Sequence, residues 1–381
     1  MGEPPHPRRT PLLVAALVAS AVLAIAVGLW VRSEPADVGA DRLPEDAHRY
    51  ASIPKIDVHV HVPASRYEEA VRVLASHGIR LALNASGGHP GPELDATIAA
   101  SGRVDGAIRS YCNLDWSRAE HDFGAYAVAA LRQCREAGAV GLKIFKSLGL
   151  GVRLSNGELL RVDDPRLDPA FDEAGRLGMP VLIHTGDPQA FFRPPSSDNE
   201  RYDELEAHPS WSFYGDGWPA WEDVFAQYEA RVARHPGTRF LGAHFGNAPE
   251  EPERVGRMLD RYPNLYVETA ARIPEIGRHD AARMRQLFMR HRDRILFGTD
   301  LQLGRTSWVL GSAGAEPDPP SRIPAFFEAH WRYFETDDRD FPHPTPIQGR
   351  WRIDGLALPR DVLEALYHAN AERLFGLPAA E

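Results

Sequence analysis

The chain has 381 residues, of which 43% are hydrophobic and 25% charged, and 53 acidic residues against 43 basic ones give a net charge of −10. This composition is that of a globular protein and excludes collagenous, disordered and coiled-coil chains. Nucleic acid is not expected as a partner, because phosphate binding needs clustered positive charge. The only cysteines, Cys112 and Cys134, have neither metal-site nor redox spacing. We therefore expect two buried thiols rather than a disulfide.

The N-terminal region differs from the rest of the chain. Residues 12–31 carry no charge and follow Arg8 and Arg9, and a run of this length spans a bilayer as a helix. Residues 1–32 are therefore predicted to form a membrane anchor or uncleaved signal, with the following chain exported. The small-x-small sequence at residues 24–26 makes the alternative a secreted or periplasmic protein released by signal cleavage. The polar residues 33–51 are predicted to form a tether.

Eight apolar runs of strand length alternate with amphipathic helical stretches over residues 52–377. The predicted strands are Ile53–Val60, Ile79–Asn84, Val104–Ser110, Val140–Phe145, Pro180–His184, Arg239–Ala243, Leu265–Thr269 and Ile295–Thr299. Helical stretches include Arg66–His77, Asp122–Ala137, Trp221–His235, Ala281–His291 and Arg360–Phe375. This alternation predicts an α/β fold, a (β/α)8 or TIM barrel. A doubly wound open sheet is the alternative, but residues 149–151 lack the third glycine of a dinucleotide-binding turn.

Two connections are long and rich in aromatic residues. Residues 186–219 follow the fifth predicted strand, and residues 301–350 follow the eighth. Both leave the carboxyl ends of strands, where barrel enzymes build their active sites, and long loops in compact domains are often lids. The alternatives are a packing layer or an aromatic contact between subunits of a homo-oligomer.

Histidine and aspartate side chains are concentrated where the predicted strands end. His59 and His61 end the first strand, and they share one face because strand side chains alternate. The fifth strand ends at His184, the sixth at His244 and the eighth is followed by Asp300. Buried imidazoles and carboxylates need partners, and a cation supplies one. These strand ends therefore predict a metal site at the mouth of the barrel.

This set of motifs resembles the amidohydrolase superfamily, in particular its amidohydrolase-related branch with proteins of the aminocarboxymuconate-semialdehyde decarboxylase type. The resemblance covers residues 53–377. Besides the strand-end histidines, it includes Phe297–Asp300 and the closing segment Asn370–Gly376. The resemblance implies that the metal ligands are His59, His61, His184 and Asp300. It also implies that His244 lies beside the bound water or substrate, as a second-metal ligand or a proton-handling residue.

The apolar fourth strand contains a lysine, Lys143. In binuclear members of the superfamily a lysine of this strand bridges two metals as a carbamate, and burial favours carbamylation because it lowers the amine pKa. The mononuclear branch instead implies a lysine that orients substrate. We expect one ion, Zn²⁺ by ligand type, and the alternative is a second ion bridged by carbamylated Lys143.

The expected chemistry is hydrolysis of a C–N or C–O bond, in an amide, ester or lactone, by metal-activated water. Asp300 would act as general base and then protonate the leaving group, while His244 would stabilise the oxyanion. Arg272 beyond the seventh strand, and Asn199 with Arg201 in the first long connection, are candidates for binding a small carboxylate-bearing substrate. The alternatives for these residues are a surface or helix-capping arginine and a solvated turn.

Two other functions are compatible with the sequence. The first is a non-oxidative decarboxylase on the same scaffold, and the second is a non-catalytic, membrane-tethered binding domain. The intact ligand set argues against the binding domain, which has no need of an open catalytic metal position. Export favours hydrolysis over decarboxylation, because scavenging or ester cleavage fits an exported enzyme better than an intermediate step of catabolism.

Overall fold

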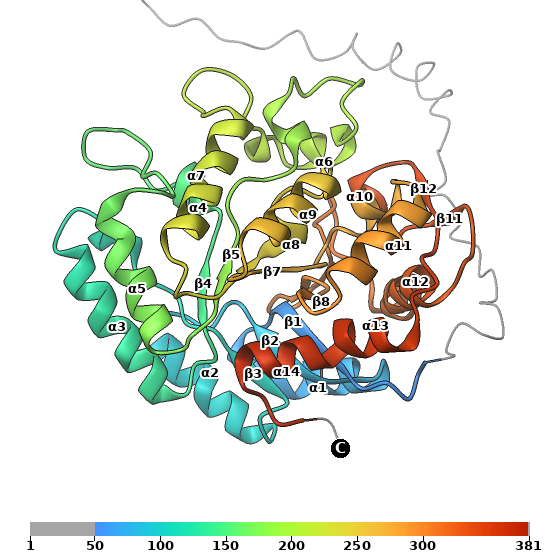
Figure 1. The fold of residues 1–381 in the computed structure, drawn as a ribbon, viewed down its shortest axis with the longest axis horizontal. Helices are drawn as coiled ribbons and strands as arrows, with labels where there is room; N and C mark the ends of the chain where they lie inside the picture. Colours follow the sequence, from blue (N-terminus) through green and yellow to red (C-terminus); the bar gives the residue numbers. More distant parts are fainter. Residues whose placement is uncertain (1–49, 380–381) are drawn as a thin grey trace, which may run out of the picture. The chain divides into compact units, whose positions relative to one another are not determined.

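The computed structural model describes residues 50–379. The predicted anchor and nearly all of the predicted tether lie outside this range. Within it, no helix is both long enough and apolar enough to cross a bilayer. The described chain alternates strands with helices and forms two five-stranded sheets, with helices outside them (Figure 1).

Eight parallel strands form the framework. They are β1 (Lys55–His61), β2 (Ile79–Asn84), β3 (Ile108–Ser110), β4 (Leu142–Ile144), β5 (Val181–Ile183), β6 (Phe240–Gly242), β7 (Leu265–Glu268) and β8 (Ile295–Leu296). The first three pair in chain order in one sheet, and β4 to β8 do so in the other. A parallel bridge between Cys112 and Leu142 links the sheets on one side. On the other side the Val58 amide donates to the Phe297 carbonyl at 3.0 Å. All eight predicted strands are present, and their order is consistent with a (β/α)8 barrel.

The eighth strand is interrupted after Leu296, earlier than predicted. The chain then enters the other five-stranded sheet as β9 (Leu301–Leu303), which runs parallel to the end of β1 and is followed by the antiparallel β10 (Trp308–Leu310). Asp300 lies in this interruption, and its amide donates to the His59 carbonyl at 2.8 Å. The interruption therefore places Asp300 beside the histidines of β1.

Helices cover the strands, and their ends follow local sequence signals. α3 (Phe123–Ala137) ends at Gly138 with φ 93°, a left-handed conformation that glycine adopts readily. α11 (Ala281–Arg290) begins after Asp280, whose side chain accepts from the Arg283 amide at 2.9 Å. The other long helices are α1 (Tyr67–Ser76), α2 (Pro92–Arg103), α5 (Asp168–Arg176), α7 (Trp221–Arg234) and α9 (Pro252–Arg261). The predicted last helix comprises α13 (Arg360–Glu364), a π-helical turn (Ala365–Ala369) and α14 (Asn370–Phe375).

Most of the second long connection is a packing layer. It contains β9, β10, α12 (Ile323–Glu335) and β11 (Phe341–Pro342), which pairs with β12 (Arg352–Ile353). Five aromatic residues of α12 are buried in the main apolar core: Phe326, Phe327, Trp331, Tyr333 and Phe334. The first connection contains the short helix α6 (Tyr202–Ala207) and buries Phe191 and Phe213 in a smaller cluster.

The prediction of two free thiols is wrong, because Cys112 and Cys134 form a disulfide. Cys112 follows β3, and Cys134 lies on the buried face of α3. Their Cα atoms are 6.0 Å apart, a separation that a disulfide spans. A spacing of 22 residues in sequence does not indicate this pairing, which depends on how α3 packs back on the strand before it.

Candidate metal centre

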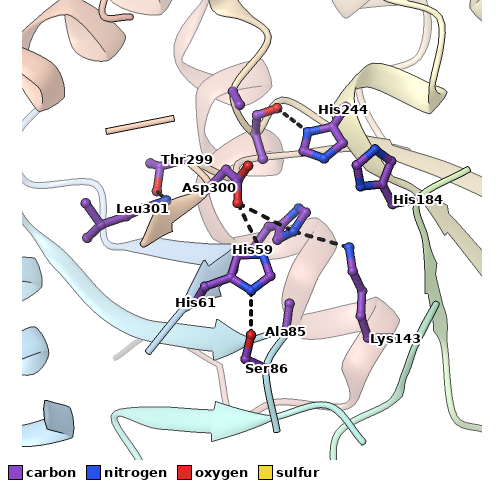
Figure 2. Close-up of polar contacts among 12 residues, drawn as sticks. His59, His61, Ala85, Ser86, Lys143, His184, His244, Thr299, Asp300 and Leu301 are labelled. Atoms are coloured by element: carbon purple, nitrogen blue, oxygen red, sulfur yellow. Dashed lines mark hydrogen bonds and ion pairs between the residues drawn. The ribbon is translucent and has the colours of Figure 1, made fainter. Parts of the chain in front are cut away.

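Three predicted ligands converge at the end of β1. The Nε2 atom of His61 lies 3.2 Å from Asp300 Oδ1, and that of His59 lies 3.8 Å from the same oxygen (Figure 2). The three atoms lie within 4.8 Å of one another. Asp300 Oδ1 is buried and accepts no well-aligned hydrogen bond. A bound cation would supply the missing partner of this buried carboxylate oxygen and would also bind the two imidazole nitrogens that face it. These residues therefore fit a divalent metal.

The neighbours of the two histidines fix their ring orientations. His59 Nδ1 donates to Glu268 Oε1 at 2.9 Å, which leaves Nε2 as the ring nitrogen that carries the lone pair. His61 Nδ1 is hydrogen-bonded to Ser86 Oγ at 2.7 Å, so that its Nε2 also faces Asp300. Partners of this kind typically orient metal-binding imidazoles in proteins.

The charges at the centre suit a metal ligand set. Burial alone would raise the pKa of Asp300, but the contact with His61 and the positive charge of Lys143 lower it to about 2. Burial lowers the pKa of His59 well below its usual value. The centre therefore combines an ionised carboxylate with a neutral imidazole, the forms that bind metals.

His184 and His244 lie next to each other, and the structure does not bring His184 into the group of three. Their rings meet edge-on with centroids 4.2 Å apart, and His184 Nε2 lies 3.6 Å from Asp187 Oδ1. His244 Nδ1 donates to the Ala270 carbonyl at 2.9 Å. Burial lowers the pKa of His184 to about 4 and that of His244 well below its usual range, so both imidazoles are neutral at pH 7.

A second group of possible ligands consists of His59, His244 and Glu268. Glu268 is fully buried, and besides His59 it binds the backbone amides of His244 and Ala270. Because its carboxylate already has these three donors, it acts as a support that holds β1, β6 and β7 in one arrangement. The structure thus offers a metal site around His59 whose finer ligand set stays a prediction.

Lys143 projects from β4 toward the same centre. Its Nζ lies 3.3 Å from His59 Nε2 (Figure 2). Burial lowers the pKa of Lys143 to about 8, although the carboxylates of Asp300 and Glu268 oppose this shift. The lowered pKa favours carbamylation, which is one of the two predicted uses of Lys143, and both uses stay predictions.

Arg272 lines a small cavity together with His184, His244 and Asn247. Its side chain is buried, and its guanidinium donates to the Ala271 carbonyl at 2.8 Å. Among residues 50–379, no carboxylate lies within ion-pair distance of Arg272. A buried cation without such a partner is suited to receive an anionic group of a ligand.

The other two predicted substrate residues are engaged by the protein itself. Arg201 is buried and forms ion pairs with Glu204, at 2.6 Å, and with Glu275. Asn199 Nδ2 donates to the carbonyls of Ala190 and Pro194 at 2.8 and 3.0 Å. Neither residue lines the cavity with Arg272. Both hold the first long connection in place, and their part in substrate binding stays a prediction.

Sequence reasoning missed three residues that contact the predicted ligands, namely Ser86, Asp187 and Glu268. Glu268 could have been found, because it lies at the end of the predicted seventh strand like the histidines of the other strands. Ser86 and Asp187 lie in loops, where serine and aspartate are common, and no pattern separates them from ordinary turn residues.

The family model for amidohydrolases matches residues 56–377, so the chain belongs to the amidohydrolase family and is an enzyme of the amidohydrolase superfamily. No curated protein matches the chain in sequence.

Solved structures of similar fold include a 2,6-dihydroxybenzoate decarboxylase, 16% identical, with 85% of this chain and 99% of that one covered and a TM-score of 0.49. A probable 2-pyrone-4,6-dicarboxylic acid hydrolase from Acinetobacter baumannii is 11% identical, with 84% and 99% covered and a TM-score of 0.48. A 4-oxalomesaconate hydratase from Rhodopseudomonas palustris is 13% identical, with 85% and 96% covered and a TM-score of 0.47. These likenesses are too distant to assign a reaction.

Proposed function

We propose that this enzyme is a zinc-dependent hydrolase that cleaves an amide, ester or lactone bond in a small, carboxylate-bearing substrate. The observation that carries the proposal is the ionised Asp300 carboxylate beside the Nε2 atoms of His59 and His61. His184 would complete the ligand set after a change in its contact with Asp187. One ion per chain is proposed, and a second ion bridged by carbamylated Lys143 is the alternative.

Each residue around the centre has a separate role in the proposed reaction. A divalent ion bound there lowers the pKa of water and polarises a carbonyl group. Asp300 takes the proton of the attacking water and passes it to the leaving group. His244, held through its Nδ1 by the Ala270 carbonyl, presents its other ring nitrogen to the developing oxyanion. Arg272 binds the substrate carboxylate.

One observation favours a second candidate, a metal-dependent decarboxylase. A decarboxylase needs a cation that holds the departing carboxylate, and the buried Arg272 beside His184 and His244 provides one. Both reactions would use the same residues. Hydrolysis is preferred because Asp300 supplies the proton shuttle that it needs, and because decarboxylation further requires a route for protonating the carbanion.

Product analysis in oxygen-18 water separates the two reactions. The zinc-loaded enzyme is first screened against panels of lactones, esters, amides and aromatic acids. For a turned-over substrate, hydrolysis predicts one labelled oxygen in the carboxylate product. Stoichiometric release of CO2 without label in the organic product would refute hydrolysis and support the decarboxylase.

We further propose that the catalytic domain is exported. The Cys112–Cys134 disulfide supports this, because disulfides persist in oxidising compartments and are rare in the cytosol. The uncharged residues 12–31 behind Arg8 and Arg9 would provide the anchor or signal.

A further inference from the structure

A second cavity, of about 440 Å³, lies in the first long connection and the start of α7. This volume falls within the range of small-molecule sites, about 300–1,000 Å³. The residues that decide its chemistry are Phe192, Phe213, Trp218, Trp221, Arg193 and Gln189. None of them lines the cavity that contains Arg272.

The wall of this cavity is built from interlocking aromatic rings. The Phe213 ring lies 5.3 Å from that of Phe192 and 4.9 Å from that of Trp218, the latter edge-on. Arg153 holds Trp218 in place, with its guanidinium 5.7 Å from the indole. Phe213 is buried, whereas Phe192 and Trp218 keep part of their surface open. Fixed, partly open rings in a hollow favour a flat apolar ligand.

The wall contains one cation, Arg193, and one carboxylate, Glu222. Glu222 also lines the cavity, but its carboxylate is bound by Arg254 at 2.9 Å. Arg193 is exposed and donates to Gln189 Oε1 at 3.2 Å. In the part of the chain that the structure describes, no carboxylate is within ion-pair distance of Arg193. A guanidinium without an ion-pair partner beside aromatic walls is complementary to an anion.

A short segment of chain separates this cavity from the metal centre. Asp187 faces His184 with its side chain, while its carbonyl accepts a hydrogen bond from Trp221 Nε1 at 3.1 Å. Gln189, two residues further, already lines the aromatic cavity. The segment Gly186–Gln189 therefore forms a wall between the two cavities. The two cavities are separate sites, and each would bind its own ligand.

We propose that the aromatic cavity is a binding site for a planar aromatic carboxylate. Its ring would pack against Phe213 and Trp218, and its carboxylate would accept hydrogen bonds from Arg193. The site goes beyond the proposed hydrolysis and does not depend on it.

The test uses 2-naphthoate as the anionic probe and 2-naphthamide as its neutral analogue, with binding measured by ligand-observed NMR. Removal of the ring in Trp218→Ala should weaken 2-naphthoate binding about tenfold. The parent enzyme should prefer 2-naphthoate over 2-naphthamide about tenfold, and Arg193→Gln should abolish this preference. Because Arg193 is exposed, its substitution tests the site even if Trp218→Ala disturbs the fold.

Two controls separate the proposal from its alternatives. Tyr214→Ala removes an exposed aromatic ring of the same connection that does not line the cavity, and binding should be unchanged. Arg272→Gln alters the other cavity, and binding should again be unchanged. The proposal is overturned if the parent does not bind 2-naphthoate, if Arg193→Gln keeps the preference for the anion, or if Arg272→Gln abolishes binding.

Discussion

In the proposed mechanism, both metal binding and proton transfer depend on Asp300. Replacement by asparagine keeps its size but removes the charge that faces His59 and His61. We expect Asp300→Asn to lose bound zinc, from a parent value near one ion per chain, and to lower kcat by roughly 10²–10⁴-fold. Elemental analysis and turnover of the screened substrate measure the two effects.

A matched control for this variant is Asp340→Asn. Asp340 also has a left-handed backbone, with φ 49° against 58° for Asp300, but it is exposed and outside the centre. Asp340→Asn should keep zinc and activity. Full zinc content in Asp300→Asn would show that the carboxylate is not a ligand.

His330 makes the stability of the fold depend on pH. Burial lowers its pKa to about 4, and its Nδ1 contacts the Phe326 carbonyl at 2.7 Å. An exposed histidine has a pKa of about 6.5, so between these values only the unfolded chain binds the proton. The stability that the neutral ring contributes is thus complete above pH ~6.5 and is lost as pH falls toward 4.

Substitution by glutamine, which does not titrate, should remove this contribution. Between pH 7.5 and 5 the parent should lose about 2 kcal/mol more unfolding free energy than His330→Gln. Urea unfolding at the two pH values measures the difference. His121→Gln, at an exposed histidine, is the control and should follow the parent. Equal pH dependence in the parent and His330→Gln would contradict the prediction.

At the scale of residues, the sequence was informative for the polar side chains that lie at the ends of predicted strands. His59, His61 and Asp300 could be expected to meet because the carboxyl ends of barrel strands face one mouth. The contact of His184 with Asp187 could not be expected from the sequence, because it depends on the path of the loop after β5. For the same reason the burial of Arg201 between Glu204 and Glu275 was not foreseen.

At the scale of elements, apolar runs identified each strand, and β2 agrees with its predicted bounds, Ile79–Asn84. Three strands near the centre, β5, β6 and β7, each end one residue before the predicted apolar run ends, whereas β1 continues to His61. β8 is the extreme case and stops at Leu296. Hydrophobicity cannot reveal such an end, since Phe297 remains buried beyond the last residue of β8.

The disulfide is the covalent link between two such elements, β3 and α3. Loop closure over 22 residues stabilises a fold by about 3 kcal/mol. We expect Cys112→Ala/Cys134→Ala to lose about this much unfolding free energy in urea while keeping zinc. Reductant should destabilise the parent and leave the double variant unchanged. Two alkylatable thiols in unfolded protein that was never exposed to reductant would contradict the disulfide.

At the scale of the whole molecule, the proposed topology places the enzyme outside the cytoplasmic membrane. A phosphatase fused after Ala51 should be active, and a green fluorescent protein at the same point should not fluoresce, because residues 12–31 direct export. Deletion of residues 1–32 should reverse both results. Fluorescence of the full-length fusion without phosphatase activity would refute the topology.

The backbone of the centre has a consequence for how this enzyme can evolve. His244, Phe245, Ala271 and Asp300 have φ values of 54° to 58°, a conformation that costs a non-glycine residue about 1–2 kcal/mol and that glycine adopts freely. Backbone strain alone would therefore favour glycine at positions 244 and 300, the same positions where the proposed function requires histidine and aspartate. Under the proposed function, lineages adapting to higher temperature would have to gain stability elsewhere in the chain, and glycine at these positions in a descendant would mark the loss of catalysis.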